Sequence, residues 1–136
     1  MSDYKKPLPE SSVESKPFWE ACKRHELVVP RCAKCTHHWF PASATCPKCW
    51  STEWAWAKVS GQGKVYSFGV YHRAYDKSFQ EELPYALVIV ELAEGPRLTT
   101  NVVGCKPAAL SCDMPVEVVF EDVTEARTLY KFKPVV

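Results

Sequence analysis

Four cysteines in the stretch RCAKCTHHWFPASATCPKC, residues 31–49, have the types and spacing to do chemistry. They form two Cys-x-x-Cys pairs, Cys32 with Cys35 and Cys46 with Cys49. Two residues between paired cysteines let the chain fold back tightly, so both thiolates point at one ion, and a second pair completes a tetrahedron. Four thiolates leave no open position for water or substrate. The spacing therefore predicts a structural zinc ion, which would contribute folding energy on the order of 10 kcal/mol.

Other chemistries fit these cysteines less well. His37 or His38 could replace one ligand, but both lie directly behind the first pair. The same geometry binds iron in electron-transfer rubredoxins. A disulfide-exchange pair usually follows a strand and opens a helix, whereas the prolines here indicate loop. Three further cysteines lack ligand spacing: Cys22, Cys105 and Cys112. His72 is the only histidine outside residues 25–38 that could activate one of them, so we interpret them as small hydrophobic residues.

Composition limits the classes of function. The chain has 136 residues, of which 46% are hydrophobic and 24% charged, as in one globular domain or two small modules. A net charge of +1 excludes a large basic field. The longest apolar run, YALVIV at 85–90, is far shorter than a membrane span, and MSDYKKPLPESS has no signal-peptide h-region. With an odd number of cysteines, seven, these features predict a reducing cytoplasmic location.

The N-terminal part predicts an arm and one helix. Residues 1–13 are polar and proline-containing, which indicates a loose arm. A helix is predicted from about Ser15 to Arg24, with Ser15 as its cap. Phe18 and Trp19 then share a helical face. This face could pack on the body of the chain, which the pattern favours, or bind a partner.

Strand patterns dominate the rest of the chain. HELVVPRC leads into the first cysteine pair and WAWAKVSG follows the second. Five β-rich runs then occur, at 64–71, 85–92, 97–103, 116–123 and 127–133. The fold class predicted is mainly β: an N-terminal arm and helix at 1–30, a zinc ribbon at 31–57 and a five-stranded OB-type barrel at 58–136. An SH3-like barrel or an open sandwich fits nearly as well on pattern alone.

One loop is long for so compact a barrel. It reads HRAYDKSFQEELP at residues 72–84, and loops of this length often carry function. Its cations could meet phosphates and its aromatic residues could cover a ligand. These candidates are His72, Arg73, Tyr75, Lys77 and Phe79. An ordinary solvated loop fits equally well, because two glutamates follow the cations.

Two classes of function compete on chemistry alone. Zinc ribbons and OB barrels both occur in single-stranded nucleic-acid binders, but 17 Lys and Arg face 16 Asp and Glu, with only a modest basic stripe at Arg127, Lys131 and Lys133. A stand-alone enzyme lacks its parts, since there is no Gly-rich phosphate loop, nucleophile elbow or open metal site. A zinc module on a small aromatic-rich barrel favours a subunit or adaptor that binds another protein.

The order of motifs carries a resemblance that covers about residues 17–133. PFWEACKRHELVVPRCAKC is followed by FPASATCPKC, SGQGKVYSF, LPYALVIVELAEG and MPVEVVFED. This order resembles the bacterial and archaeal family of small proteins that combine a rubredoxin-like zinc ribbon with an acyl-CoA-associated OB fold.

The resemblance implies a non-catalytic accessory subunit of a thiolase-superfamily complex, either an acyltransferase (thiolase) or a carbon–carbon lyase. In such complexes the partner enzyme supplies the catalytic residues. The small subunit stabilises it and helps to complete the acyl-CoA channel, for example for aromatic or steroid acyl-CoA esters such as benzoylsuccinyl-CoA. By the same resemblance Cys32, Cys35, Cys46 and Cys49 are the zinc ligands, and the Phe18–Trp19 helix and the OB loops are contact surfaces.

Two positions depart from the family pattern. Thr36 stands where glycine commonly follows the second cysteine, at a turn that needs a left-handed residue. Asp113 stands where a Gly-Met or Gly-Asp turn is common, a change that a turn can absorb.

Overall fold

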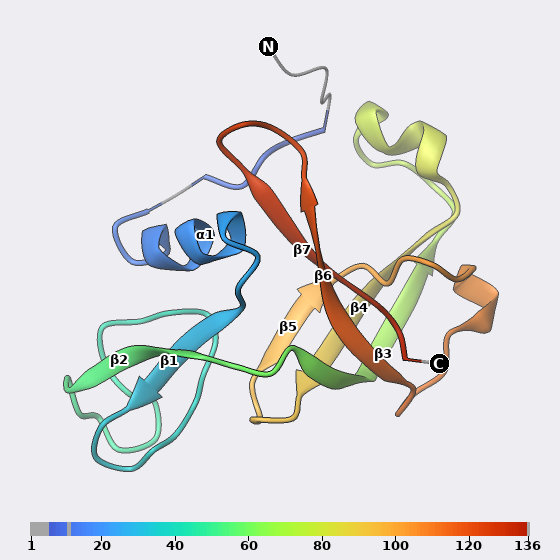
Figure 1. Cartoon of the computed structure of the whole chain (residues 1–136). Coiled ribbons are helices and arrows are strands. Elements are labelled where there is room, and N and C mark those ends of the chain that lie inside the picture. Colours follow the sequence, from blue (N-terminus) through green and yellow to red (C-terminus); the bar gives the residue numbers. More distant parts are fainter. Residues whose placement is uncertain (1–5, 11, 136) are drawn as a thin grey trace.

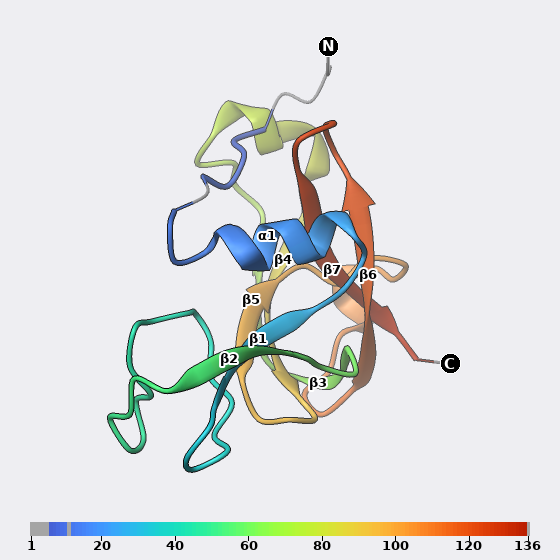
Figure 2. The same ribbon diagram turned by 60° about the vertical axis from the view of Figure 1, so that its left-hand side comes forward.

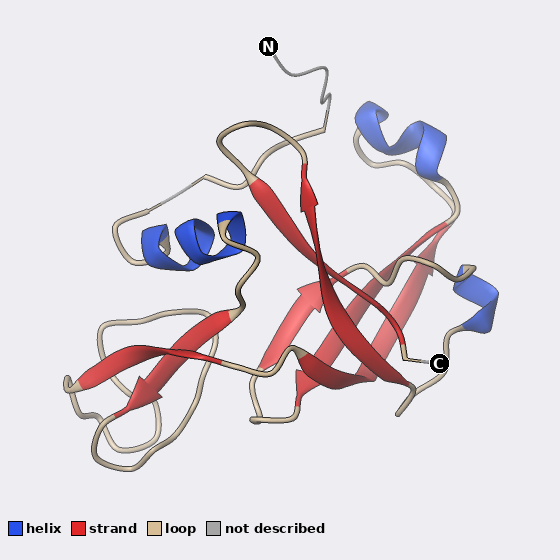
Figure 3. Cartoon of the chain, viewed as in Figure 1, coloured by secondary structure: helices blue, strands red, loops and turns tan. Residues whose placement is uncertain are grey.

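The computed structural model describes residues 6–10 and 12–135, so the predicted arm over residues 1–13 lies partly outside the described residues. Within the described part, the fold is mainly β with an α-helix near the N-terminus (Figures 1 and 3). The elements are α1 (Lys16–Lys23), β1 (Val28–Cys32), β2 (Trp54–Lys58), β3 (Gln62–Tyr71), the 3-10 helix η1 (Lys77–Glu82), β4 (Tyr85–Leu92), β5 (Arg97–Thr100), η2 (Pro107–Ala109), β6 (Pro115–Asp122) and β7 (Thr128–Pro134).

Helix α1 lies where the sequence predicts a helix, but its first turn is not capped as predicted. Ser15 occupies the N-cap position, yet its hydroxyl makes no capping hydrogen bond. It accepts a hydrogen bond from the backbone N–H of Ser12 at 2.9 Å instead. Ser15 has helical backbone angles (φ −95°, ψ −9°), whereas a capping hydroxyl usually comes from an extended residue. The predicted capping role of Ser15 is therefore wrong.

Strands β1 and β2 form an antiparallel hairpin that carries the cysteine loops. The register runs from Val28 opposite Lys58 to Cys32 opposite Trp54. Residues 33–53 therefore leave and re-enter the fold at neighbouring positions. Figure 2 shows these loops projecting from the hairpin, away from the barrel.

The remaining strands form one antiparallel sheet in the order β5-β4-β3-β6-β7. The sheet curls until its ends approach each other: Val102 bridges Phe132, and the backbone N–H of Val103 donates to the carbonyl of Phe132 at 2.7 Å. A curled five-stranded sheet of this order is the half-barrel of an OB fold. The predicted mainly β fold with an N-terminal helix and an OB-type barrel is confirmed.

Strand β5 is shorter than the predicted run at 97–103, because the chain changes partner after Thr100. The side-chain amide of Asn101 donates to the backbone carbonyl of Ala86 on β4 at 2.6 Å. The backbone carbonyl of Asn101 accepts from the N–H of Phe132 on β7 at 3.1 Å. Asn101 therefore joins the two ends of the sheet.

One hydrophobic core connects the helix, the hairpin and the barrel. Its buried side chains include Phe18 and Cys22 from α1, Val29 from β1, and Val65 and Phe132 from the barrel. A second, much smaller cluster lies in the cysteine loops. The alternation of buried and exposed residues along β4 and β5 explains why period-2 patterning found these strands. Among residues 6–10 and 12–135, no helix combines the length and apolar character needed to cross a membrane.

Candidate metal centre and ligand-facing loop

The structure brings the four cysteines of the two pairs together. Their Sγ atoms all lie within 4.8 Å of one another. The Sγ atoms of Cys32 and Cys49 are 3.5 Å apart, and those of Cys35 and Cys46 are 3.6 Å apart. A tetrahedral zinc ion with Zn–S bonds of about 2.3 Å needs sulfur atoms roughly 3.8 Å apart. The arrangement therefore fits a structural zinc ion that uses all four thiolates.

Backbone geometry in each turn explains how the cysteines converge. The N–H groups of Lys34 and Cys35 both donate to Cys32 Sγ at 3.4 Å. Thr36 (φ 64°) and Trp50 (φ 66°) each follow the second cysteine of a pair and adopt the left-handed conformation. Each closes its turn by donating its N–H to the carbonyl of the first cysteine of its pair, at 3.1 and 2.9 Å. Thr36 thus adopts the turn expected of glycine, at a steric cost of about 1–2 kcal/mol.

The four thiols shift one another's pKa because they lie close together. Hydrogen bonds from the backbone N–H groups of Cys35 and then Lys34, opposed by burial, lower the pKa of Cys32 to about 6. A backbone hydrogen bond from Ser51 lowers the pKa of Cys49, but the neighbouring thiols and burial outweigh it and raise that pKa to about 12. Four thiols this close together cannot all ionise unless a positive charge lies between them.

The two histidines behind the first pair have other roles. The group of potential metal ligands found among the described residues contains only the four cysteines. The ring of His37 stacks on Trp39 with centroids 6.3 Å apart, and His38 bridges Arg31 through the backbone. Trp39 and Trp54 cover the cluster, donating their indole N–H groups to Ser43 and to a backbone carbonyl. The aromatic residues therefore shield the cysteine cluster, in a module too small to have a large hydrophobic core of its own.

The other cysteines lie apart from this centre. Cys22 is buried in the main core, and burial raises its pKa to about 12. Cys105 is half-buried and Cys112 is exposed. A thiol with a raised pKa is a poor nucleophile, which agrees with the interpretation of Cys22 as a small hydrophobic residue.

The aromatic pair of helix α1 faces the body of the chain. Phe18 is 2% exposed, and its ring contacts those of Trp19, Phe40 and Tyr130 at 5.0 to 5.4 Å. Trp19 is half-buried against the same core. Phe18 therefore packs within the chain itself, while contact of this helix with a partner stays a prediction.

The long loop contains a structured half and an exposed half. Asp76 caps η1, accepting a hydrogen bond from the N–H of Ser78 at 2.9 Å. Before the cap, Tyr75 is 76% exposed and Arg73 lies over its ring, with 5.3 Å between the guanidinium carbon and the centroid. His72, Arg73 and Tyr75 line one shallow hollow of about 260 Å³. Three of the loop candidates thus lie together, while Lys77 is in η1.

Sequence reasoning missed two tyrosines whose rings connect Phe79, another loop candidate, to Tyr75. Tyr71 and Tyr85, opposite each other on β3 and β4, stack with centroids 5.2 Å apart. Tyr75 packs edge-on against Tyr71 at 6.1 Å, and Phe79 packs against Tyr85 at 5.5 Å. A continuous row of four rings results. The predicted β-rich runs at 64–71 and 85–92 contained Tyr71 and Tyr85 respectively, but only the strand pairing could show that they meet.

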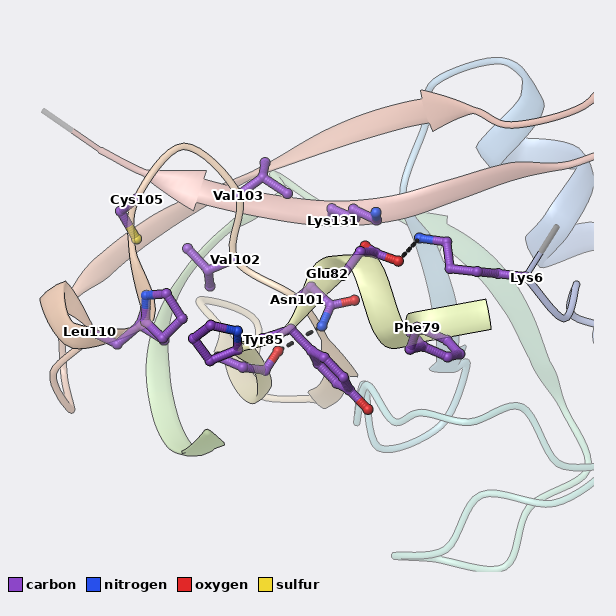
Figure 4. Close-up of a pocket in the computed structure, with 13 residues that line it drawn as sticks. Lys6, Phe79, Glu82, Tyr85, Asn101, Val102, Val103, Cys105, Leu110 and Lys131 are labelled. Atoms are coloured by element: carbon purple, nitrogen blue, oxygen red, sulfur yellow. Dashed lines mark hydrogen bonds and ion pairs between the residues drawn. The ribbon is translucent and has the colours of Figure 1, made fainter. Parts of the chain in front are cut away.

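A pocket of about 260 Å³ lies between this loop and the connection after β5 (Figure 4). One end is charged, with Lys6 paired to Glu82 at 2.7 Å and Lys131 paired to Glu121 at 2.6 Å. The other end is lined mainly by apolar side chains, namely Val102, Pro107, Leu110 and Cys105. The pocket therefore suits an elongated group with one polar and one apolar end.

Two family models match adjoining parts of the chain. Residues 19–55 match the ChsH2 rubredoxin-like zinc ribbon domain, and residues 56–121 match the ChsH2 C-terminal OB-fold domain. The chain is similar to a solved structure titled "Ltp2-ChsH2(DUF35) aldolase", with a TM-score of 0.86 and 36% identity over 95% of this chain and 100% of that one.

Curated relatives agree with this match. A DUF35 domain-containing scaffold protein of Methanocaldococcus jannaschii is 41% identical, over 86% of this chain and 88% of its own length. The benzoylsuccinyl-CoA thiolase subunit BbsA of Thauera aromatica is 30% identical, over 77% of this chain and 74% of its own. The chain therefore belongs to the DUF35 family, in which a ChsH2-type zinc ribbon precedes a C-terminal OB-fold domain.

Proposed function

We propose that this chain is an accessory subunit of a thiolase-superfamily enzyme complex that acts on acyl-CoA esters. One observation carries the proposal: the likeness to a chain solved as part of an Ltp2-ChsH2(DUF35) aldolase spans 95% of this chain, including both the ribbon and the barrel. A relative named as a benzoylsuccinyl-CoA thiolase subunit supports the same class of partner. The partner would carry out the carbon–carbon bond chemistry.

The metal centre has a structural part in this function. Zinc bound by four thiolates has no position for a substrate or an activated water. The ion would instead hold residues 33–53 against the β1–β2 hairpin. It would thereby fix a surface beside the barrel for contact with the partner.

The barrel loops would contribute to the acyl-CoA channel. Two rings at one end of the row, Tyr85 and Phe79, line the pocket that has a charged and an apolar end, and we propose that an acyl-CoA ester occupies it. His72, Arg73 and Lys77 would approach the CoA phosphates, while Phe79 and the pocket would shield the acyl group from water. An aromatic or steroid acyl-CoA, such as benzoylsuccinyl-CoA, is the substrate class that we propose.

Co-expression tests the assembly. The chain is produced alone and together with a thiolase-like protein from the same organism, and each preparation is assayed with a 3-oxoacyl-CoA and CoA. We expect a stable complex, with turnover only when both are present. Turnover by this chain alone, or no complex with any thiolase-superfamily protein of that organism, would contradict the proposal.

A loop variant tests the acyl-CoA contact within the assembled complex. Lys77→Ala should raise the KM for acyl-CoA by up to about fivefold and leave kcat unchanged, since a cation at the surface contributes about 1 kcal/mol or less. Lys58→Ala, at the exposed end of β2, is the matched control and should change neither constant. Equal KM values for both variants would exclude Lys77 from the channel.

Single-stranded nucleic acid is the competing ligand, because Tyr75 and the tyrosines behind it could stack bases. The balance of 17 basic against 16 acidic residues argues against tight binding at physiological salt. A fluorescent oligonucleotide titrated into the free chain distinguishes the two, and we expect no saturable binding.

A further inference from the structure

Strand β3 has one edge that is paired only at its beginning. Along the full length of β3 the register with β4 extends from Gly63 to Tyr71. On the other edge, β6 pairs only with residues 62–64. The second half of β3 therefore has a neighbour on one side alone.

Hydrogen bonds at the start of β3 show which peptide groups face which side. Val65 faces the β6 side, because its N–H donates to Met114 at 3.0 Å and its carbonyl accepts from Asp113 at 2.7 Å. Gln62 faces β4, because its carbonyl accepts from the N–H of Ala93 at 2.9 Å. Successive peptide groups of an antiparallel strand point to opposite edges.

A β-bulge between Val65 and Ser67 interrupts this alternation. Beyond the bulge, the direction of each peptide group of β3 is therefore worked out from its partner on β4. Leu92 of β4 faces β5, because its N–H donates to the carbonyl of Pro96 at 2.8 Å. The odd-numbered residues from 85 to 91 therefore face β3. Beyond the bulge their partners on β3 are Ser67, Gly69 and Tyr71.

The peptide groups of Phe68 and Val70 consequently point toward the open edge. Among the hydrogen bonds of the described residues, none joins either group to a partner on that side. Both residues are half-buried, and Gly69 between them is exposed, with no atom within 4 Å of the position that a Cβ would take. An unpaired edge of this kind is a template for an added strand.

An apolar hollow of about 560 Å³ adjoins this edge. Its lining joins the end of β3 to the connection that carries η2: Val70, His72, Pro84, Lys106, Pro107 and Ala108. Figure 1 shows that connection, in orange, on the side of β3 away from β4. Four of the six lining residues are apolar and none is acidic. A hollow beside an open strand edge can hold a side chain of an extended peptide.

The charges around the hollow select the kind of segment. His72 and Lys106 line it, and Arg73 and Tyr75 line the neighbouring hollow, with no acidic residue in either lining. At the far end of the edge, Asp113 pairs with Lys64 at 3.5 Å. A second copy of this chain would bring the same cations face to face, which disfavours pairing of two β3 edges.

We infer that the β3 edge at Phe68–Val70 accepts an extended, acidic segment of the partner enzyme as an added strand, with one of its apolar side chains in the adjoining hollow. The inference rests on the proposed function and names the docking surface. Main-chain hydrogen bonds would supply the register, and Lys106, which the proposed acyl-CoA contact does not use, would favour an acidic segment.

Amide hydrogen exchange of the free chain and of the co-expressed complex tests the pairing. In the free chain the amides of Phe68 and Val70 should exchange fast and those of Gly69 and Tyr71 slowly. In the complex the first two should slow by at least about tenfold. Unchanged exchange of Phe68 and Val70 in a stable complex overturns the inference and leaves the proposed function intact. Protection that already exists in the free chain, or that follows its self-association, also overturns it.

Two variants test the same surface by affinity. Val70→Pro removes the outward N–H, which an edge strand tolerates, whereas Val70→Thr keeps it at nearly the same volume. We expect about tenfold weaker binding of the partner for the first than for the second. Lys106→Glu should weaken binding by a similar factor, more at low salt, with Lys58→Glu, at the exposed end of β2, as its control.

Zinc content and melting temperature establish that each variant is folded. If Val70→Pro does not fold, Lys106→Glu and the exchange experiment still test whether the partner binds at the β3 edge. Wild-type affinity in folded Val70→Pro and Lys106→Glu overturns the inference. Failure of the wild-type chain to bind any thiolase-superfamily partner contradicts the proposed function instead.

Discussion

Removal of the metal should unfold the cysteine loops and leave the barrel folded. The two regions have separate hydrophobic clusters: the small one contains Cys32, Trp39 and Cys46, with Cys35 and Trp54 against it. The large one joins α1, β1 and the barrel. Because the clusters are separate, we expect the chelated chain to lose one and keep the other.

The free energy that the cysteine loops lack without the metal can be worked out from the apolar area that the small cluster buries. Two tryptophan side chains of 150–250 Å² each contribute about 8–12 kcal/mol together, at roughly 25 cal/mol per Å². Ordering residues 33–53, between the end of β1 and the start of β2, costs about 20 kcal/mol or more at ~1 kcal/mol per residue. The deficit of about 10 kcal/mol is close to what a structural zinc ion supplies, ~10–16 kcal/mol. Without the ion the loops should therefore be unfolded.

The five tryptophans report on the two regions separately in an NMR spectrum of indole N–H groups. Chelation should collapse the signals of Trp39, Trp50 and Trp54 toward random-coil positions. Those of Trp19 and Trp56, which pack against the large core, should stay dispersed. Cys49→Ser should reproduce the effect, and Cys112→Ser, at an exposed free cysteine, should bind one zinc ion per chain like the wild type. Dispersed Trp39 and Trp54 signals in the metal-free chain, or collapse of all five, would refute the reasoning.

Two further predictions concern stability. Thr36→Gly should raise the free energy of unfolding by about 1 kcal/mol, because glycine adopts the left-handed turn without steric cost, whereas Thr52→Gly should lower it; thermal melts of both variants with zinc bound check the sign. Hydrogen bonds from Thr128 and then His25 hold the pKa of Asp122 below its usual 3.8, so the folded chain favours the carboxylate. That stabilisation is complete above the unfolded pKa and is lost as pH falls through the folded pKa. In urea titrations Asp122→Asn should therefore be less stable than the wild type near neutral pH, and the gap should close on acidification; a gap independent of pH would contradict this.

Local residue patterns were sufficient for the metal centre and for most of the strands. The ligand spacing of Cys32, Cys35, Cys46 and Cys49 is a property of two tight turns, each only a few residues long, and the four Sγ atoms lie together as that spacing predicts. Alternating burial in β4 and β5 is equally local. Thr36 adopts the left-handed turn that its position in the sequence indicated, and Asp113, for which only a turn was predicted, is left-handed as well.

The tertiary structure decided the features that depend on segments far apart in the chain. Ser15 has the residue type of a helix cap, but its backbone angles and the nearby Ser12 give its hydroxyl another partner. Phe18 could have been a contact residue by its helical face, yet Phe40 and Tyr130, brought in by other elements, bury it.

The surfaces proposed for function also depend on segments that are far apart in the chain. Tyr71 meets Tyr85 only through the register of two strands, and Lys6 meets Glu82 only when the N-terminal segment crosses the long loop. The open edge at Val70 exists because β6 begins at Pro115, opposite Lys64, and runs from there toward the start of β3. By itself the sequence predicted which four cysteines would come together and where the strands lie, since turns and alternation depend on near neighbours. Long-range pairing placed the ring row, the pocket and the free edge, since loop closure and strand register depend on the whole barrel.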